Sequence, residues 1–206
     1  MTAKKLRGHS YPVMEDYYTI QGEGTNTGTS AYFIRLGGCD VGCPWCDVKE
    51  SWPLNGFPRL SPEQMLKKVL ASGARTVVIT GGEPLLHDLS ALCQTFRKKK
   101  IRMFLETSGA YSMSGEWDWI CVSPKKFRPP LASNLRIADE LKVIVFNSSD
   151  FTWAEQQAKK VKKQCRLYLQ PEWGKAGRML REVIAYVKQN HTWKISLQTH
   201  KYINIP

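Results

Sequence analysis

The chain has 206 residues, of which 42% are hydrophobic, and its formal net charge is +12. Its length and apolar content suffice for one core, so we expect residues 1–206 to form a single domain. No apolar run reaches the roughly 18 residues of a membrane-spanning helix, and the basic N-terminus lacks the apolar core of a signal peptide. The six cysteines, three of them clustered, indicate a metal site in a reducing compartment, and we expect a cytoplasmic protein.

The excess of basic residues could indicate binding to a polyanion, because several lysines stand in short runs. The lysines at 159–160 and 162–163, however, follow a helical pattern with Glu155 and are typical of a solvated helix face. We therefore do not expect nucleic-acid binding. An acidic redox partner or an anionic substrate is the kind of partner that the charge favours.

The first part of the chain predicts two strands and a helix. We expect residues 1–12 to be a flexible lead and residues 13–20 to form a short strand. The apolar run at 31–36 predicts a buried strand, which the glycines at 37–38 let the chain leave by a sharp turn. Ser61 begins a helix as its N-cap, because a proline and then a glutamine follow at capping-box spacing.

Strands and helices then alternate. Strands are predicted at 75–79, 101–105, 117–122, 141–146, 166–169 and 193–197, and helices at 88–99, 150–163 and 176–189. Alternation of this kind is typical of parallel strands joined by right-handed crossovers. Only about a dozen residues separate the strands at 101–105 and 117–122, too few for a crossover helix. Residues 124–139 contain two prolines and no sustained helical period. We therefore predict an α/β fold, an abbreviated and incomplete (β/α) barrel with reduced helices.

Three cysteines, Cys39, Cys43 and Cys46, lie on the loop after the strand at 31–36 with the spacing C-x3-C-x2-C. Thiolates clustered in this way bind zinc or an iron–sulfur cluster. Structural zinc needs a fourth protein ligand, and the next histidine and cysteine along the chain are His87 and Cys93. Three ligands leave one iron of a four-iron cluster open to a substrate or cofactor. We therefore predict an open-iron cluster, and we expect the three remaining cysteines to be small buried hydrophobic residues.

Polar residues recur where the predicted strands end, and the carboxyl ends of parallel strands share one rim. Besides the cysteines they are Thr80, Glu106, Ser108, Ser123, Lys125, Gln170, Gln198 and His200. Arg35 lies inside an apolar strand and needs either a protein carboxylate or a substrate anion as its partner, and Glu23 has a comparable choice. Glu140 and Lys142 flank another strand, where an exposed strand end explains them equally well.

The cysteine spacing, with the aromatic Trp45 just before the last cysteine, resembles the signature of the radical S-adenosylmethionine superfamily. The segment Thr80-Gly-Gly-Glu-Pro84 resembles the one that, in this superfamily, presents backbone groups to the amino end of S-adenosylmethionine. The resemblance implies a [4Fe-4S] cluster on the three cysteines, with S-adenosylmethionine at its open iron. It also implies a set of residues that bind this cofactor: Trp45, Gly81, Gly82, Glu83, Ser108, Ser123 and Lys125.

Nearly the whole chain resembles the 7-carboxy-7-deazaguanine synthase family. The matching features are Ile20-Gln-Gly-Glu-Gly24, the strand with Arg35, Cys46-Asp47, Glu106-Thr-Ser-Gly109, and the tail Leu197-Gln-Thr-His200 ending at Pro206. This resemblance implies a lyase of queuosine and 7-deazapurine biosynthesis that converts 6-carboxy-5,6,7,8-tetrahydropterin to 7-carboxy-7-deazaguanine with loss of ammonia. It implies a homodimer reduced by a partner such as flavodoxin. It places the pterin substrate against Ile20, Gln21, Glu23, Arg35, Thr80, His200 and Pro206.

The chain departs from the family pattern in one respect. Family members often place Thr or Ser directly after the Cys-Asp pair, where the hydroxyl helps to bind Mg²⁺ beside the substrate. Here that position is Val48, which has no ligand atom. The Mg²⁺ implied by the resemblance would therefore need other oxygens, for which Asp47 is a candidate.

Two other functions are compatible with parts of the sequence. A glycyl-radical-enzyme activase shares the cysteine motif, but it has no use for the segment Gln21-Gly-Glu23 or for a buried Arg35. A non-catalytic iron–sulfur or zinc module could bind RNA through the lysines. Cleavage of S-adenosylmethionine distinguishes an enzyme from a binding module, and turnover of the pterin distinguishes the synthase from the activase.

Overall fold

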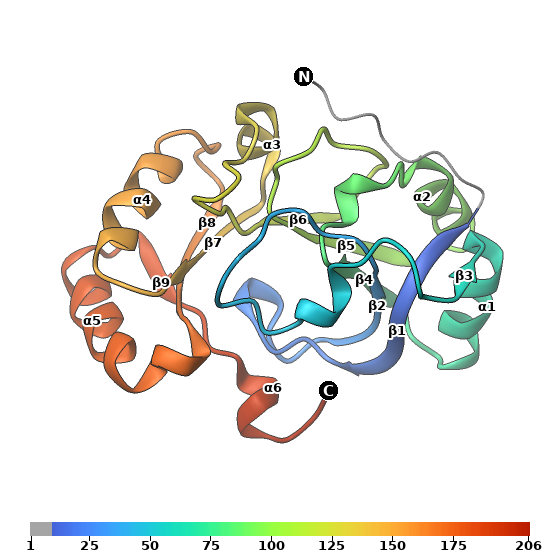
Figure 1. The fold of residues 1–206 in the computed structure, drawn as a ribbon, viewed down its shortest axis with the longest axis horizontal. Coiled ribbons are helices and arrows are strands. Elements are labelled where there is room, and N and C mark those ends of the chain that lie inside the picture. Colours follow the sequence, from blue (N-terminus) through green and yellow to red (C-terminus); the bar gives the residue numbers. More distant parts are fainter. Residues whose placement is uncertain (1–9) are drawn as a thin grey trace.

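The structure is a computed structural model that describes residues 10–206. Its centre is a curved sheet of nine strands in the order β3-β1-β2-β4-β5-β6-β7-β8-β9 (Figure 1). The strands are β1 (Tyr11–Ile20), β2 (Ser30–Leu36), β3 (Arg59–Leu60), β4 (Thr76–Gly81), β5 (Arg102–Thr107), β6 (Trp119–Val122), β7 (Glu140–Val145), β8 (Arg166–Pro171) and β9 (Trp193–Ile195). From β2 to β9 neighbouring strands run parallel, whereas β1 is antiparallel to both β2 and β3.

Helices α1 to α5 lie along the outer, convex side of this sheet, and α6 lies near its open side (Figure 1). The helices are α1 (Pro62–Ala71), α2 (Ser90–Arg97), α3 (Ala132–Ile137), α4 (Ser149–Ala158), α5 (Ala176–Gln189) and α6 (Thr199–Tyr202). Within residues 10–206 the edge strands β3 and β9 do not pair with each other, so the barrel stays open, as predicted. No helix in this range is long and apolar enough to cross a bilayer.

The N-terminal prediction was partly wrong. Residues 1–9 of the expected flexible lead lie outside the described residues, but Tyr11 and Pro12 belong to β1. They pair with Leu60 and Arg59 of β3, and the buried Tyr11 donates a hydrogen bond to the carbonyl of Asp88 at 2.7 Å. A partner strand far along the chain therefore extends β1 beyond its local apolar pattern.

The crossover after β6 also differs from the prediction. No sustained helical period is present between 124 and 139, yet α3 occupies 6 residues of this stretch directly after the two prolines. The buried Leu135 and Asn134 hold this short helix, and the Asn134 side-chain amide donates to the carbonyls of Gly109 and Tyr111. The predicted helix at 150–163 ends earlier, at Ala158, because a turn brings Cys165 back to the sheet.

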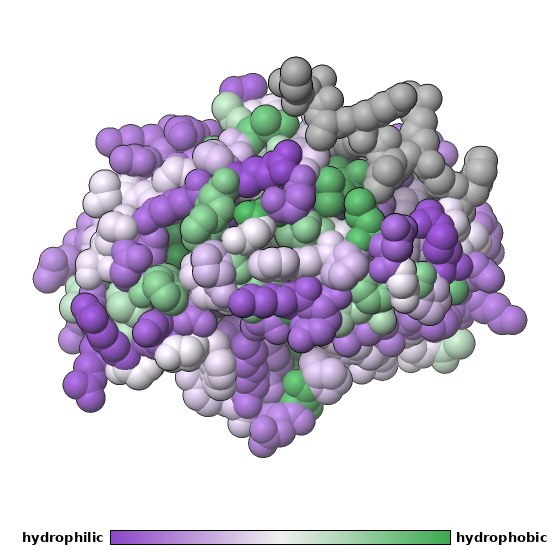
Figure 2. Space-filling view, in the orientation of Figure 1, coloured by the Kyte–Doolittle hydropathy of each residue, from purple (hydrophilic) through white to green (hydrophobic). Residues whose placement is uncertain are grey.

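The core of the described residues leaves space at one end of the barrel interior. Two large apolar clusters fill the space between the sheet and its outer helices. Inside the barrel a smaller cluster of Ala31, Val78 and Phe104, with Phe33 and Trp119 packed against it, closes the end where the parallel strands begin. Figure 2 shows apolar residues towards the middle of one face and hydrophilic residues over the outer helices. The opposite end of the barrel interior is left for polar residues.

Glu83, which the resemblance assigns to the cofactor, is a structural cross-link between strand ends. Its side chain is 1% exposed and accepts hydrogen bonds from the backbone N–H of Leu85 at 3.0 Å and of Ser108 at 2.8 Å. The hydroxyls of Thr107 and Ser108 also donate to it. This carboxylate thus ties the loop after β4 to the end of β5, which places the preceding glycines.

We predict that Glu83→Ala destabilises the fold by at least about 2 kcal/mol, because it leaves several buried donors without an acceptor. Urea denaturation under anaerobic conditions measures the loss. The control is Glu116→Ala, since the Glu116 side chain is 79% exposed and pairs only with the half-exposed Arg97. Equal unfolding midpoints for both variants would contradict this structural role.

Candidate active site

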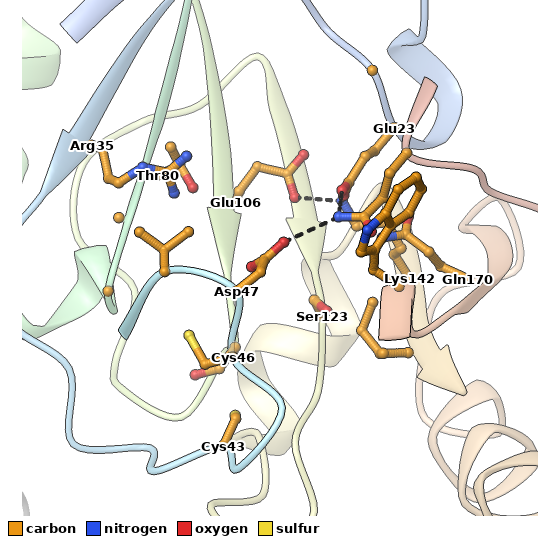
Figure 3. Close-up of a pocket in the computed structure, with 18 of the residues that line it drawn as sticks. Glu23, Arg35, Cys43, Cys46, Asp47, Thr80, Glu106, Ser123, Lys142 and Gln170 are labelled. Atoms are coloured by element: carbon orange, nitrogen blue, oxygen red, sulfur yellow. Dashed lines mark hydrogen bonds and ion pairs between the residues drawn. The ribbon is translucent and has the colours of Figure 1, made fainter. Parts of the chain in front are cut away.

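A cavity of about 280 Å³ opens at the carboxyl ends of the parallel strands. Its walls come from β1, β2, the cysteine loop, β4 to β8 and the C-terminal segment (Figure 3). All but one of the site residues singled out in the sequence line it. They are Cys39, Cys43, Cys46, Trp45, Gly81, Gly82, Ser108, Ser123, Lys125, Ile20, Gln21, Glu23, Arg35, Thr80, His200 and Pro206. The exception is Glu83, whose side chain is used in the cross-link described above.

The cysteine loop is packed directly on the glycines that follow β4. A Cβ on Gly82 would stand 2.7 Å from the Cβ of Cys39 and would collide with the carbonyl of Gly38. Backbone hydrogen bonds from Gly38 to Ser51 at 2.7 Å and from Cys39 to Trp52 at 3.0 Å fix the other side of the loop. Only glycine therefore lets the two segments approach this closely.

The donor set on this loop fits an iron–sulfur cluster with one open iron. In the described residues no group of three or more His, Cys, Asp or Glu side chains is close enough to hold a single metal ion, so the three cysteines do not form a zinc site as they stand. His87 Nε2 lies 2.9 Å from the carbonyl oxygen of Gly37 and Cys93 is buried in the core, so neither adds a fourth ligand. Burial raises the pKa of Cys39 to about 11 and also raises that of Cys43. Both therefore need a metal's positive charge to become thiolates.

A partly buried lysine, Lys125, faces the cysteine loop from beyond the end of β6. Lys125 Nζ donates to the carbonyl and the hydroxyl of Ser123, both at 2.6 Å, and lies 5.7 Å from the ring centroid of Trp45. Burial lowers the pKa of Lys125, although the nearby Cys43 opposes this shift. Among the described ion pairs none includes Lys125, so its ammonium has only neutral protein partners.

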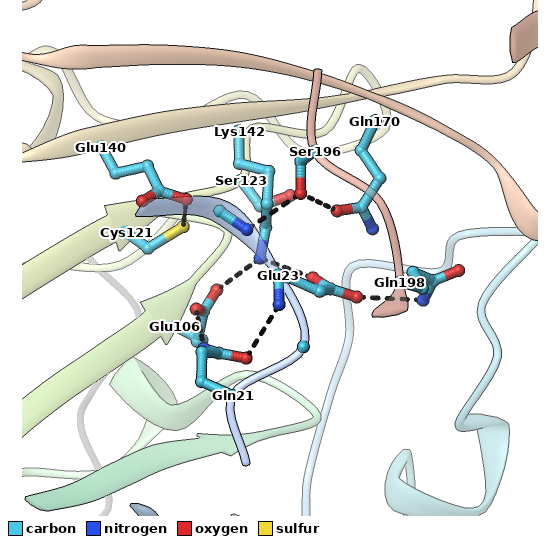
Figure 4. Close-up of polar contacts among 12 residues, drawn as sticks. Gln21, Glu23, Glu106, Cys121, Ser123, Glu140, Lys142, Gln170, Ser196 and Gln198 are labelled. Carbon is cyan, nitrogen blue, oxygen red and sulfur yellow. Dashed lines mark hydrogen bonds and ion pairs between the residues drawn. The ribbon is translucent and has the colours of Figure 1, made fainter. Parts of the chain in front are cut away.

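Opposite the cysteines, a buried charge network crosses the cavity floor (Figure 4). Lys142 Nζ lies 2.6 Å from Glu23 Oε2 and 3.0 Å from Glu106 Oε2. The side-chain amide of Gln21 donates to Glu106 at 3.1 Å, and that of Gln198 donates to Glu23 at 3.0 Å. The ammonium of Lys142 in β7 thus contacts a carboxyl group from the segment after β1 and one from β5, and Gln21 and Gln198 each support one of these carboxyl groups.

The three ionisable groups of this network, Glu23, Glu106 and Lys142, shift one another's pKa values. Burial raises the pKa of Glu106, with the Glu140 and Glu23 carboxylates adding to the rise and Lys142 opposing it. Burial would also raise the pKa of Glu23, but contact with Lys142 and the bond from Gln198 outweigh it, and the pKa is lowered. For Lys142 burial alone would lower the pKa, but the surrounding acidic groups raise it. At neutral pH, therefore, the ammonium pairs first with ionised Glu23, and Glu106 is the carboxyl that more readily holds a proton.

Of the two partners expected for Arg35, a protein carboxylate or a substrate anion, the structure shows the protein carboxylate. Its Nε lies 2.6 Å from Glu15 Oε1, and its Nη2 donates to the Tyr17 hydroxyl at 3.5 Å. Glu15 is 41% exposed at its side chain, so water weakens this pair. The guanidinium also lines the cavity, where it can reach a second anion.

The C-terminal tail folds back against the segment after β1. The N–H and the hydroxyl of Thr199 both donate to the carbonyl of Gly22 at 2.9 Å, and the Thr19 hydroxyl donates to the carbonyl of Pro206 at 3.0 Å. A Cβ on Gly22 would collide with the His200 ring. This contact holds His200 and the chain end at the cavity.

Sequence reasoning left open the burial of two charged residues and missed part of the cavity lining. The exposed-strand-end interpretation of Lys142 and Glu140 was wrong, because the residues are 3% and 2% exposed. A charge inside the apolar strand Glu140–Val145 was the available signal, since a buried lysine requires partners. Asp47 and Val48, which the sequence analysis considered for Mg²⁺, line the cavity. Trp173 lines it too, and no local pattern marks this residue.

Comparisons with known proteins agree with this geometry. The family model of the Radical SAM superfamily matches residues 33–203. The 7-carboxy-7-deazaguanine synthase of Flavobacterium psychrophilum is 51% identical over 200 residues, covering 97% of this chain and 95% of the relative. That of Synechocystis is 47% identical, covering 95% and 94%.

A solved structure shows the same fold. The crystal structure of QueE from Escherichia coli superposes with a TM-score of 0.83 at 32% identity, covering 91% of this chain and 93% of that one. The match spans nearly all of both chains. The chain belongs to the radical S-adenosylmethionine superfamily and, within it, to the 7-carboxy-7-deazaguanine synthase family.

Proposed function

We propose that the protein is a 7-carboxy-7-deazaguanine synthase, a radical S-adenosylmethionine lyase of queuosine and 7-deazapurine biosynthesis. It converts 6-carboxy-5,6,7,8-tetrahydropterin to 7-carboxy-7-deazaguanine with loss of ammonia. The observation that carries the proposal is a single cavity in which Gln21, Glu23 and Arg35 face a three-cysteine loop. The named relatives support the synthase over an activase or an RNA-binding module.

The cofactor side of the cavity is the cysteine loop and the glycines packed on it. Cys39, Cys43 and Cys46 would hold the [4Fe-4S] cluster, and Gly81, Gly82, Ser108, Ser123 and Lys125 would hold S-adenosylmethionine. When bound, these two groups supply a radical able to remove a hydrogen atom from carbon. The Lys125 ammonium is suited to a ligand carboxylate, because only neutral groups of the described chain contact it.

The substrate side offers complementary groups to a flat bicyclic acid. Glu23 and the chain-terminal Pro206 can accept hydrogen bonds from the guanidine-like edge of a pterin. Arg35 can pair with the substrate carboxylate through its planar fork. Tyr17 and Phe33, whose rings stack with centroids 5.8 Å apart, form an apolar wall beside them.

Glu106 is suited to assist the departure of ammonia. When the carbon–nitrogen bond breaks, the electron pair leaves with the nitrogen, which then needs a proton. The carboxyl of Glu106 lines the cavity, and its raised pKa favours the neutral acid that can donate one. Lys142 Nζ lies 3.0 Å from Glu106 Oε2 and fixes the orientation of this carboxyl group.

For Mg²⁺ the lining residues fit less well. Val48 has no ligand atom, and the Asp47 carboxylate already lies 2.9 Å from Lys201 Nζ and accepts from Gln198 at 3.2 Å. Ionisation of Asp47 is favoured by Lys201, which together with hydrogen bonds overcomes burial and lowers its pKa. We therefore assign no step to Mg²⁺.

Three further features belong to the same proposal. The unbroken sheet supports one domain over residues 1–206, and exposed apolar residues such as Tyr202 and Ile203 near the tail support a homodimer. The net charge of +12 supports an acidic electron donor such as a flavodoxin. The six cysteines are all free, which supports a reducing, cytoplasmic location.

Anaerobic incubation tests the function directly. Reconstituted and reduced protein is mixed with S-adenosylmethionine and 6-carboxy-5,6,7,8-tetrahydropterin, and 7-carboxy-7-deazaguanine and ammonia are measured. We expect one ammonia per deazapurine. Bound iron and sulfide with no deazapurine formed would overturn the assignment.

We predict that Arg35→Ala raises the KM for the carboxypterin by roughly 100-fold or more, because the substrate carboxylate loses its paired cation. Iron and sulfide content should remain those of the wild type. Arg97→Ala, on the outer face of α2, serves as the matched control and should leave the KM unchanged. An unaltered KM for Arg35→Ala would remove Arg35 from the substrate site.

We predict that Glu106→Gln lowers kcat by about 100- to 10,000-fold, since an amide cannot supply the proton that departing ammonia needs. The wild-type kcat should fall as pH rises through the pKa of Glu106, because only the protonated form acts as the acid. That pKa is raised, so the fall should lie above the range of an ordinary carboxyl group. A Glu106→Gln enzyme with normal kcat would exclude this role.

A further inference from the structure

The segment after β1 fills the part of the barrel interior that faces β7, β8 and β9. It carries Gln21 and Glu23 and then forms the short 3-10 helix Gly24–Asn26. Side chains alternate along β7, with Leu141, Val143 and Val145 packed in the outer core, so Glu140 and Lys142 point inward. The segment therefore takes up interior space beneath the cavity, on the side of the open barrel away from the cysteines.

Three side chains hold this segment from the far side of the barrel, and Figure 4 labels two of them, Glu140 and Ser196. The N–H of Thr25 donates to Glu140 Oε2 at 2.9 Å, and the Thr25 hydroxyl donates to Tyr168 at 3.3 Å. The N–H of Gly24 donates to the Ser196 hydroxyl at 2.9 Å, and that hydroxyl donates to Gln170 at 2.7 Å. Strands β7, β8 and the residue after β9 thus each contribute one contact.

Glu140 is the charged member of this set, and packing alone does not account for it. It is 2% exposed, does not line the cavity, and none of the described ion pairs includes it. Its described hydrogen bonds come from the Thr25 N–H and from the Cys121 thiol at 3.5 Å. A buried carboxylate is costly unless it has a specific partner, and here that partner is the backbone of the segment.

Gly24 shows how tightly this contact is built. Its φ is +64°, and a Cβ at this position would collide with Glu140 Oε1. Gly28, two residues beyond the segment 21–26, has φ +89°, but a Cβ added there would meet nothing within 4 Å. The two glycines therefore both have a positive φ, but of the two only Gly24 lies close to Glu140.

We propose that Glu140 is a positioning residue that latches the segment 21–26 across the open barrel and thereby places Gln21 and Glu23 for the substrate. The latch itself does not depend on the proposed function. Its consequence for the carboxypterin rests on that function. Without the bond to Thr25, the segment can move away from β7, and Glu23 loses its fixed place beside Lys142.

Amide hydrogen exchange tests the latch without any substrate. In Glu140→Ala we expect exchange at Gly24 and Thr25 to rise by about 10- to 100-fold, since a bond from a backbone N–H to a buried carboxylate is lost. Glu140→Gln retains an acceptor oxygen and should stay near the wild type. Asp150→Ala is the matched control. Asp150 accepts from the N–H groups of Phe146 and Asn147 at the other end of β7, so exchange should rise only there. Unchanged protection of Thr25 in Glu140→Ala would overturn the proposal.

Two glycine variants test the consequence for catalysis. We expect Gly24→Ala to raise the KM for the carboxypterin by about 10-fold or more, and Gly28→Ala to raise it far less, although both add strain at a positive φ. Cleavage of S-adenosylmethionine in the absence of the pterin should be alike in the two variants. Equal KM values would overturn the positioning role even if Glu140→Ala fails to fold. A wild-type protein that does not turn over the carboxypterin would instead refute the proposed function and leave the exchange result valid.

Discussion

The places of Glu23 and Glu106 at the cavity depend on the buried ammonium of Lys142. It joins Glu23, from the segment after β1, to Glu106 of β5, and no other described ion pair connects these two parts of the chain. Burying an ammonium is costly, and its contacts with ionised Glu23 and with the carboxyl of Glu106 offset that cost. Breaking a buried pair of this kind costs about 3–5 kcal/mol, because Glu23 is left without its cation. Lys142 therefore determines where the two carboxyl groups with proposed roles in the reaction stand.

The open barrel makes such cross-links necessary. In a closed barrel every strand pairs with a neighbour on both sides. Here the edge strands of the described sheet, β3 and β9, do not pair with each other. Parts of the chain on different sides of the barrel must then be joined by side chains and tails. Lys142 joins β7 to β5 and to the segment after β1, and Thr199 joins the tail to Gly22.

Local patterns predicted the cofactor side better than the substrate side. The cysteine spacing and the glycines after β4 are contiguous motifs, and both line the cavity where parallel strands end. The positions of Lys142 and Glu140 depend on partners about 120 residues away along the chain, so neighbouring residues could not distinguish a buried strand from an exposed strand end. Tyr11 joined β1 for the same reason, because its partner Leu60 lies in β3. Pairing between distant segments is what a local pattern does not contain.

The cations of the site differ in how far protein carboxylates neutralise them. This difference distinguishes a cation that fixes the protein's own structure from a cation that is suited to bind a ligand. Lys142 is 3% exposed and contacts two carboxylates, so it has no charge left for a ligand. Within residues 10–206 Lys125 has neutral partners, the oxygens of Ser123 and the Trp45 ring, and Arg35 pairs with the half-exposed Glu15. A carboxylate ligand gains most from a cation without an ionised protein partner, since nothing must be displaced. The two incompletely neutralised cations stand on the cofactor side and on the substrate side, and the two ligands of the proposed reaction each carry one carboxylate.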